Sequence, residues 1–148
     1  MIEVVSPFPS GLSMHDRLLR GALTSNAAFS LLSGIAFLFT SSSIAQLFRG
    51  VPSWLVLAIG IGLIGFSGSV AWEARRAVLD AKGIWGITLA DAGWVVGSLI
   101  FLASPLADVR SAGGVGVIGI ALVVGTFAAL QVAGLRKTTA PSTESRSQ

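Results

Sequence analysis

Residues 84–103 read IWGITLADAGWVVGSLIFLA, an apolar run in which Asp91 is the single charged side chain. A helix of about 20 residues is long enough to cross the hydrocarbon core of a bilayer. Because lipid offers no hydrogen-bond partner to backbone polar groups, such a run is predicted to cross as a helix. The stretch therefore predicts a membrane span with one carboxylate inside it, and an ionisable residue at that depth is a candidate functional site.

Three more apolar runs of similar length predict that the chain crosses the membrane four times. Of its 148 residues, 53% are hydrophobic and 11% are charged, whereas soluble domains carry about 25% charged residues. We expect an all-α polytopic membrane protein, a four-transmembrane-helix bundle at residues 18–137. It would lie between a cytoplasmic segment, residues 1–17, and a disordered Ser/Thr-rich cytoplasmic tail, residues 138–148. The expected helices cover residues 18–40, 53–72, 84–104 and 112–135.

The distribution of Lys and Arg predicts the orientation of the bundle, because cytoplasmic loops carry an excess of these residues. Of the 10 Lys and Arg residues, Arg49 and Arg110 fall on one side of the predicted bundle and the other eight fall on the opposite side. Those eight are Arg17, Arg20, Arg75, Arg76, Lys82, Arg136, Lys137 and Arg146. We therefore expect a multi-pass protein of the cell inner (plasma) membrane with its N- and C-termini in the cytoplasm.

The composition also excludes several classes of function. The chain has no Cys and a single His, His15, so thiolate metal sites, Cys nucleophiles and paired-His ligation cannot form within one chain. It contains no phosphate-binding loop, paired-His metal motif or nucleophile elbow. The basic residues flank apolar segments, a pattern that indicates membrane flanks and not a nucleic-acid surface. We expect no catalytic residue, no metal and no cofactor, and the lipid bilayer as the main partner.

A shift of 65 residues aligns the first expected helix with the third. Residues 26–29 (NAAF) fall on residues 91–94 (DAGW), and Gly60 in the second expected helix falls on Gly125 in the fourth. The match predicts two parallel helical-hairpin repeats, related by an axis along the membrane normal. Chance similarity between apolar helices, which share a small alphabet, is the alternative. If the repeat is real, the first residues of the two matched stretches lie at similar depth and can meet.

Several polar side chains are predicted to lie near the depth of Asp91, which is seven residues past Ile84, or about 10 Å at 1.5 Å per residue. They are Asn26, Thr88, Trp94 and Gln131. One interpretation is a proton or ligand-binding site. The other is a network that bonds Asp91 to Asn26 or Gln131 and contributes about 0.6–2 kcal/mol to helix association. Both interpretations stay open at this point.

Small residues predict where the helices pack closely, since small side chains at four-residue spacing let helix backbones approach. Gly93 and Gly97 form one such pair and Ser30 and Gly34 form another, while the fourth expected helix carries a longer stripe. The stripe consists of Ala121, Gly125, Ala129 and Ala133. These faces fit the interior of a bundle and the interface of a homo-oligomer equally well.

Two stretches, residues 26–34 (NAAFSLLSG) and residues 91–98 (DAGWVVGS), carry a resemblance to a known group. The chain resembles small bacterial four-helix integral membrane proteins that are loosely DoxX-like, over the membrane portion or about four-fifths of its length. The resemblance implies a four-helix bundle and no particular activity. Small multidrug transporters are also short four-helix proteins, but their essential carboxylate is a Glu in the first helix. Here that helix carries Asn26 and no acid.

Three classes of function are compatible with these features. The favoured one is a non-enzymatic accessory, assembly or scaffold subunit that packs on itself or on a membrane-protein partner, because short loops leave little chain outside the membrane. The alternative is a carrier for protons or a small solute that uses Asp91. A membrane enzyme acting on lipid or quinone would need an acid–base pair, which only Asp91 and Glu73 could supply. Glu73 itself is expected at a solvated helix end.

Overall fold

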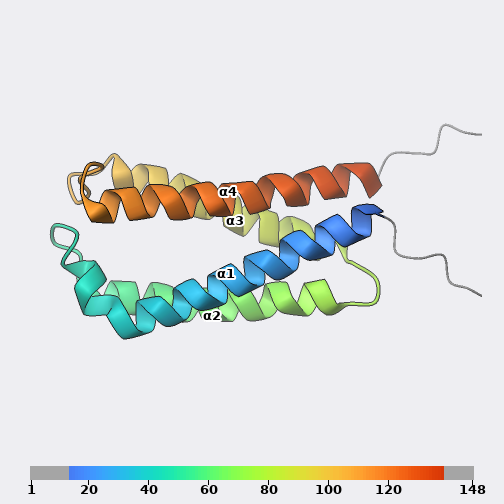
Figure 1. The fold of residues 1–148 in the computed structure, drawn as a ribbon, viewed down its shortest axis with the longest axis horizontal. Coiled ribbons are helices and arrows are strands. Elements are labelled where there is room, and N and C mark those ends of the chain that lie inside the picture. The colour runs from blue at the N-terminus through green and yellow to red at the C-terminus, as the bar shows by residue number, and fades with distance from the viewer. Residues whose placement is uncertain (1–13, 139–148) are drawn as a thin grey trace, which may run out of the picture.

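The computed structural model describes residues 14–138, and within that range the chain forms four helices and no strand. The helices are α1 (Met14–Ala45), α2 (Ser53–Arg75), α3 (Ala81–Leu102) and α4 (Ala112–Thr138). Figure 1 shows them side by side along one long axis. The predicted all-α four-helix fold is confirmed. The expectations for residues 1–13 and 139–148, including a disordered tail, fall outside the described residues.

All four helices are long and apolar enough to cross a membrane. The shortest, α3, has 22 residues, or about 33 Å at 1.5 Å per residue, against a hydrocarbon core of about 30 Å. The protein is therefore an integral membrane protein. Two helices begin at Ser53 and Ala112, as the sequence predicts, while α1 runs on through a kink at Thr40, where φ is −117° and ψ is 18°. The Thr40 hydroxyl donates a 2.6 Å hydrogen bond to the Ala36 carbonyl, a local bond that often bends helices.

The helices form two antiparallel hairpins, α1–α2 and α3–α4. The α1–α2 contact is the most extensive in the bundle, α1 also packs on α4, and α2 barely touches α3. Glycines bring α1 and α2 together, because a β-carbon added at Gly34 would lie 2.8 Å from the Gly60 carbonyl oxygen. We call the end that holds residue 14, residue 138 and the α2–α3 loop the terminal end, and the opposite end the far end. In Figure 1 the hairpins lie close together at the terminal end. At the far end their loops join, because the Arg49 backbone N–H donates a 3.0 Å hydrogen bond to the Leu106 carbonyl and the centroids of the Phe48 and Phe101 rings lie 5.2 Å apart.

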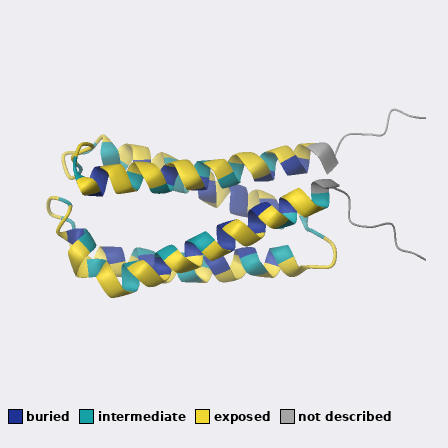
Figure 2. Ribbon diagram, viewed as in Figure 1, coloured by how far each residue is buried: buried dark blue, intermediate teal, exposed yellow. Residues whose placement is uncertain are grey.

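Burial follows the pattern of a protein surrounded by lipid. The apolar core lies near the terminal end and includes Leu19, Leu23 and Ile84, whereas large side chains such as Phe39 and Trp72 are 85% and 74% exposed. Figure 2 shows exposed residues along the whole length of every helix. In water, apolar surface of this extent would drive association. In a bilayer these side chains face acyl chains, so their exposure agrees with a membrane-spanning bundle.

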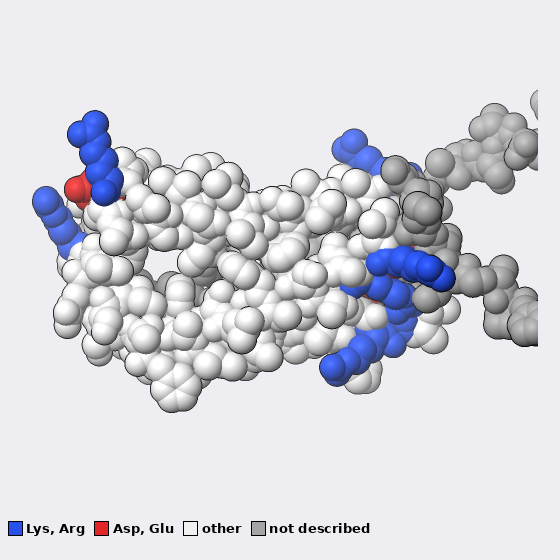
Figure 3. Space-filling view, in the orientation of Figure 1, with Lys and Arg blue, Asp and Glu red and all other residues white. Residues whose placement is uncertain are grey.

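Apart from Asp91, the charged side chains of residues 14–138 are confined to the two ends. Figure 3 shows blue and red atoms at both ends of the molecule and none on the apolar middle of the visible face. Arg49, Asp108 and Arg110 lie in the far-end loops, and the other described Lys and Arg residues lie at or next to the terminal end. The stretch between the two charged ends marks the part of the bundle that spans the hydrocarbon core, and Asp91 is the acid inside it.

Candidate functional site

The carboxylate of Asp91 lies inside the bundle and is bound by two amides from other helices. Its Oδ2 atom accepts a 2.7 Å hydrogen bond from Asn26 Nδ2 on α1 and a 3.0 Å hydrogen bond from Gln131 Nε2 on α4. Asp91 is 3% exposed, and Asn26 and Gln131 are both 0% exposed. One oxygen of α3 therefore joins three helices, and the sequence predicted both of its partners.

Two hydroxyl groups extend the network. Ser30 Oγ donates a 3.3 Å hydrogen bond to Asn26 Oδ1. Thr88 Oγ1 lies 2.7 Å from Gln131 Oε1 and 2.9 Å from the carbonyl oxygen of Ile84. A hydroxyl has one hydrogen to give, so Thr88 donates to only one of these acceptors at a time. The site is thus a row of neutral donors and acceptors around one carboxyl group.

The network links the two hairpins inside the bundle. Asn26 comes from the first hairpin, and Asp91 and Gln131 come from the second. The 65-residue repeat predicts that Asn26 and Asp91 meet, and they do. The packing around them is nevertheless not symmetric, because α1 packs on α4 while its counterpart contact, α2 with α3, is nearly absent. The site therefore takes its amides from α1 and α4 and takes nothing from α2.

The chemistry available at this site is narrow. Asp91 makes no contact with a Lys, Arg or His side chain in the part of the chain that the structure describes. No group of three His, Cys, Asp or Glu residues within residues 14–138 could hold a metal ion. The carboxyl group can accept hydrogen bonds or exchange a single proton. Among residues 14–138 it has no second acid or base in contact with which to form a catalytic pair.

Trp94, also predicted to belong to the polar cluster, takes no part in the network. It lines a cavity of about 690 Å³ in the far half of the bundle. Its indole Nε1 is buried and has no hydrogen-bond partner among the described residues. The cavity exists because α2 and α3 do not close against each other there. The indole is one helical turn from Asp91 in sequence but belongs to a different, apolar environment.

The predicted packing residues divide into two groups. Gly34 packs on α2, Ser30 and Ala121 are buried, and a β-carbon at Gly125 would lie 3.6 Å from Val95 Cγ2 on α3. The remaining predicted residues do not pack tightly against another helix within residues 14–138. These are Gly93, Gly97, Ala129 and Ala133.

The second group has a physical explanation. A β-carbon at Gly93 or Gly97 would meet no atom within 4 Å, because both glycines face the cavity between the hairpins. Ala129 is exposed on a shallow groove between α3 and α4 that also includes Ala133. Packing between helices of residues 14–138 does not use these residues, and the alternative that they lie at an interface between copies of the chain stays a prediction, because four-residue spacing identifies a helix face without identifying what covers it.

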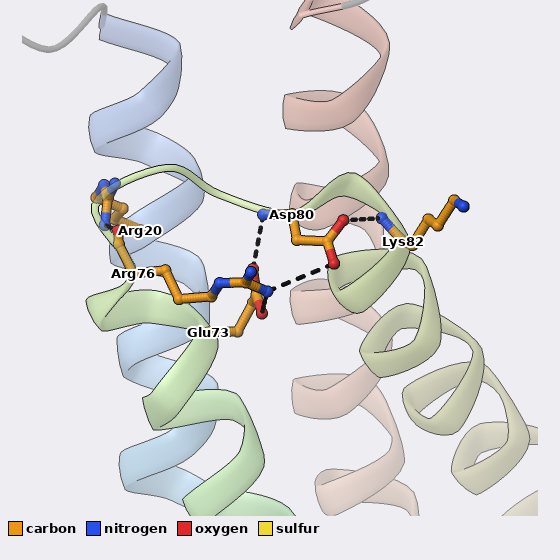
Figure 4. Close-up of polar contacts among 5 residues, drawn as sticks. All are labelled: Arg20, Glu73, Arg76, Asp80 and Lys82. Carbon is orange, nitrogen blue, oxygen red and sulfur yellow. Dashed lines mark hydrogen bonds and ion pairs between the residues drawn. The ribbon is translucent and has the colours of Figure 1, made fainter.

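A second polar cluster lies at the terminal end, and Figure 4 shows its members. Glu73 was expected at a solvated helix end, but it is 5% exposed. Its Oε1 accepts a 2.7 Å hydrogen bond from the backbone N–H of Asp80, and its Oε2 lies 3.2 Å from Arg76 Nη1. That hydrogen bond and the charge of Glu73 raise the pKa of Arg76 above its usual value. The acid fits because residue 83 is Gly, where a β-carbon would lie 2.8 Å from Glu73 Oε2.

Arg20 makes contacts in this cluster that the sequence did not predict. Its guanidinium donates three hydrogen bonds to backbone carbonyls at the end of α2 and in the loop that follows. The acceptors are Ala74 and Arg76, both at 2.8 Å, and Ala77, at 3.0 Å. Cations are favoured at helix C-termini, where carbonyl groups lack partners. Arg20 therefore caps α2, and its place one turn after Arg17 in a basic helix start is the only sequence signal for it.

Comparison with known proteins adds no assignment to this geometry. The chain matches no protein-family model, and no curated protein or solved structure is significantly similar to it.

Proposed function

We propose that the protein is a non-enzymatic accessory, assembly or scaffold subunit of a bacterial inner membrane, of the DoxX-like kind. Within residues 14–138, four spans joined by short loops leave little chain outside the bilayer. Such a protein acts through its helix faces, by holding itself or a membrane-protein partner in place. The exposed small residues around Ala129 and Ala133 form a face of the kind that membrane helices use to pack closely.

The observation that carries this proposal is the double hydrogen bond to Asp91 Oδ2. Two amides from α1 and α4 bind one acceptor inside the bundle, and each is fully buried. A carboxyl group held in this way fixes the arrangement of three helices. Polar groups in membrane proteins have this structural role, because an unpaired amide in the hydrocarbon core has no water molecule with which to form a hydrogen bond.

The excess of Lys and Arg at the terminal end supports an orientation with that end in the cytoplasm. In this orientation both termini and the α2–α3 loop are cytoplasmic, and the cavity lies in the outer half of the membrane. The Arg20 cap and the Glu73 cluster then close the bundle on its cytoplasmic side.

A second candidate is a carrier for protons or a small solute, and the cavity favours it. Ala90 and Trp94, which flank Asp91 on α3, both line the cavity. The cavity lies between the hairpins in the far half of the bundle, where Figure 3 shows the molecule hollowed, and a carrier would use such a space to hold its solute. In this alternative, Asp91 is the protonatable group and separation of its amide partners accompanies transport.

Replacement of Asp91 by Asn separates the two candidates. The substitution removes the ability to exchange a proton but keeps an oxygen that can accept from Asn26 and Gln131. A scaffold keeps its fold and its co-purifying proteins after gentle detergent extraction, whereas a proton-coupled carrier loses proton flux in proteoliposomes that contain a pH-sensitive dye. Asp108→Asn, in the α3–α4 loop, is the matched control. Loss of flux in Asp91→Asn alone would overturn the scaffold proposal in favour of the carrier.

A further inference from the structure

The shallow groove between α3 and α4 opens to the surroundings of the bundle. It holds about 640 Å³, and both helices contribute small alanine side chains to its lining, among them Ala92 and Ala129. Leu89 and Ala133, which also line it, are exposed. Because the bundle spans a membrane, the molecules that meet this groove are lipids.

The groove runs from the membrane surface into the hydrocarbon core. Arg136 lines it two residues before the end of α4, and Trp85 lines it near the start of α3. The 27 residues of α4 span about 40 Å, more than the hydrocarbon core of about 30 Å, so the last turn reaches the level of the lipid headgroups. Ala128, which also lines the groove, lies eight residues before Arg136, or about 12 Å deeper. The groove therefore follows the direction of a phospholipid, from headgroup to acyl chain.

Arg136 provides a charge that selects among lipids. Its side chain is exposed and forms no ion pair with any of residues 14–138, whereas the guanidinium of Arg20 at the same end is bound to backbone carbonyls. A guanidinium binds phosphate oxygens through two parallel hydrogen bonds. Basic pockets between membrane helices bind anionic headgroups in this way. Arg136 is thus available to an anion from outside the bundle.

A second copy of the chain fits this charge poorly. Copies inserted in one orientation would pair through the same face, and a two-fold interface brings equivalent residues together. Each Arg136 would then approach its counterpart, at the end of the bundle where most of the described Lys and Arg residues lie. Like charges oppose this approach, whereas the phosphate of a lipid is attracted to the same position.

We propose that the α3–α4 groove binds an anionic phospholipid, whose phosphate pairs with the Arg136 guanidinium and whose acyl chain lies along the alanines. The inference rests on the position of the bundle in the membrane and not on the proposed scaffold function. A scaffold partner that packs on this face would contact the bound lipid.

The test measures lipid binding to the full chain by native mass spectrometry after release from detergent micelles. The probes are dioleoyl phosphatidylglycerol, which is anionic, and dioleoyl phosphatidylcholine, which has the same acyl chains and a phosphate but no net charge. We expect the anionic lipid to bind the wild type about fivefold more tightly, the factor that one basic residue near the membrane surface gives. Arg136→Gln is expected to bind the two lipids equally.

Arg75 on α2 provides a matched control. It is exposed at the same end of the bundle, and Trp72, one turn before it, is exposed as well. The pair therefore offers an arginine and an indole at the membrane surface, as Arg136 and Trp85 do, but neither lines the groove. Arg75→Gln is expected to keep the fivefold preference for the anionic lipid.

Variants that fill the groove test the position of the acyl chain. Ala129→Leu is expected to lower the affinity for both lipids about threefold, because several atom contacts between the chain and the groove are lost. Ala58→Leu, at an exposed position of α2 outside the groove, should bind as the wild type does. Ala133→Leu, also in the groove, serves as a second variant if Ala129→Leu does not fold.

The proposal is overturned if the wild type binds both lipids equally, or if Arg136→Gln and Arg75→Gln lose the preference to the same extent. The second result would mean that the overall charge of the terminal end attracts the lipid. Unchanged lipid affinity in the groove-filling variants would place the acyl chain elsewhere. A dimer in the same spectra that Ala129→Leu dissociates would make the groove an interface between two copies of the chain.

Discussion

Asn26 and Asp91 are 65 residues apart in the chain, and a 2.7 Å hydrogen bond joins them inside the bundle. The bond connects α1 to α3 and so connects one hairpin to the other. Because α2 and α3 barely touch, the hairpins are joined by this network, by the α1–α4 contact and, at the far end, by the hydrogen bond from the Arg49 backbone N–H to the Leu106 carbonyl and the Phe48–Phe101 ring contact. The polar cluster therefore holds the bundle at mid-depth whether or not it also moves a proton.

Replacements at Asp91 should separate the contribution of its hydrogen bonds to the stability of the bundle from the contribution of its charge. Asp91→Leu leaves the amides of Asn26 and Gln131 without an acceptor, and we expect it to lower the free energy of unfolding by about 1–3 kcal/mol. Asp91→Asn keeps an oxygen that can accept these hydrogen bonds, so its free energy of unfolding is expected to lie within about 1 kcal/mol of that of the wild type. Unfolding of the purified protein in mixed detergent micelles measures both values. Equal losses in the two variants would mean that the charge, and not the hydrogen bonds, stabilises the bundle.

The α1–α2 interface should be sensitive to any side chain at its glycines. A β-carbon at Gly60 would lie 3.0 Å from the Gly34 carbonyl oxygen and 3.0 Å from Phe37 Cβ. Gly60→Leu must therefore push the helices apart, and we expect a loss of about 1–3 kcal/mol in the free energy of unfolding. Gly62→Leu on the same helix is the control, since a β-carbon at Gly62 would meet no atom within 4 Å. A similar loss in both variants would show that the close contact between α1 and α2 at Gly60 is not responsible, since Leu favours a helix more than Gly does.

The sequence was sufficient for the helices and for most of the polar network. Hydropathy predicts four spans because the membrane forces long apolar helices, and an acid surrounded by apolar residues predicts amide partners such as Asn26 and Gln131. The cavity beside Trp94 could not be predicted in the same way. It results from the separation of α2 from α3, and this separation depends on how the two complete hairpins pack against each other.

The terminal-end cluster was missed for a related reason. Glu73 and Arg20 look like ordinary flanking charges, because local sequence gives no information on the path of the α2–α3 loop. That path brings the Asp80 backbone N–H to Glu73 and the carbonyls of α2 to Arg20. Burial of Glu73 also needs the absent side chain of Gly83. Such a combination is recognisable only after the helices are placed.

The Arg20 cap should control opening of the terminal end. Arg20→Gln removes the charge and most of the hydrogen bonds to the carbonyls of Ala74, Arg76 and Ala77, and we expect a loss of about 1–3 kcal/mol in stability. Amide hydrogen exchange of residues 76–80 should also become faster, because the loop loses its hydrogen bonds to the Arg20 side chain. Arg17→Gln, at an exposed position on the same helix, should leave exchange unchanged. Faster exchange in both variants would point to general fraying of α1.

The orientation can be tested directly because the chain contains no Cys. Val78, in the α2–α3 loop, is 81% exposed, and Val109, in the α3–α4 loop, is 48% exposed. The excess of Lys and Arg on the terminal side predicts that Val109→Cys reacts with a membrane-impermeant maleimide on intact cells, whereas Val78→Cys reacts only after permeabilisation. Leu122→Cys, 68% exposed within α4, should stay unlabelled in both conditions because lipid surrounds it. Labelling of Val78→Cys alone on intact cells would mean that the orientation is the opposite of the predicted one. Labelling of both loops would mean that the protein inserts in two orientations.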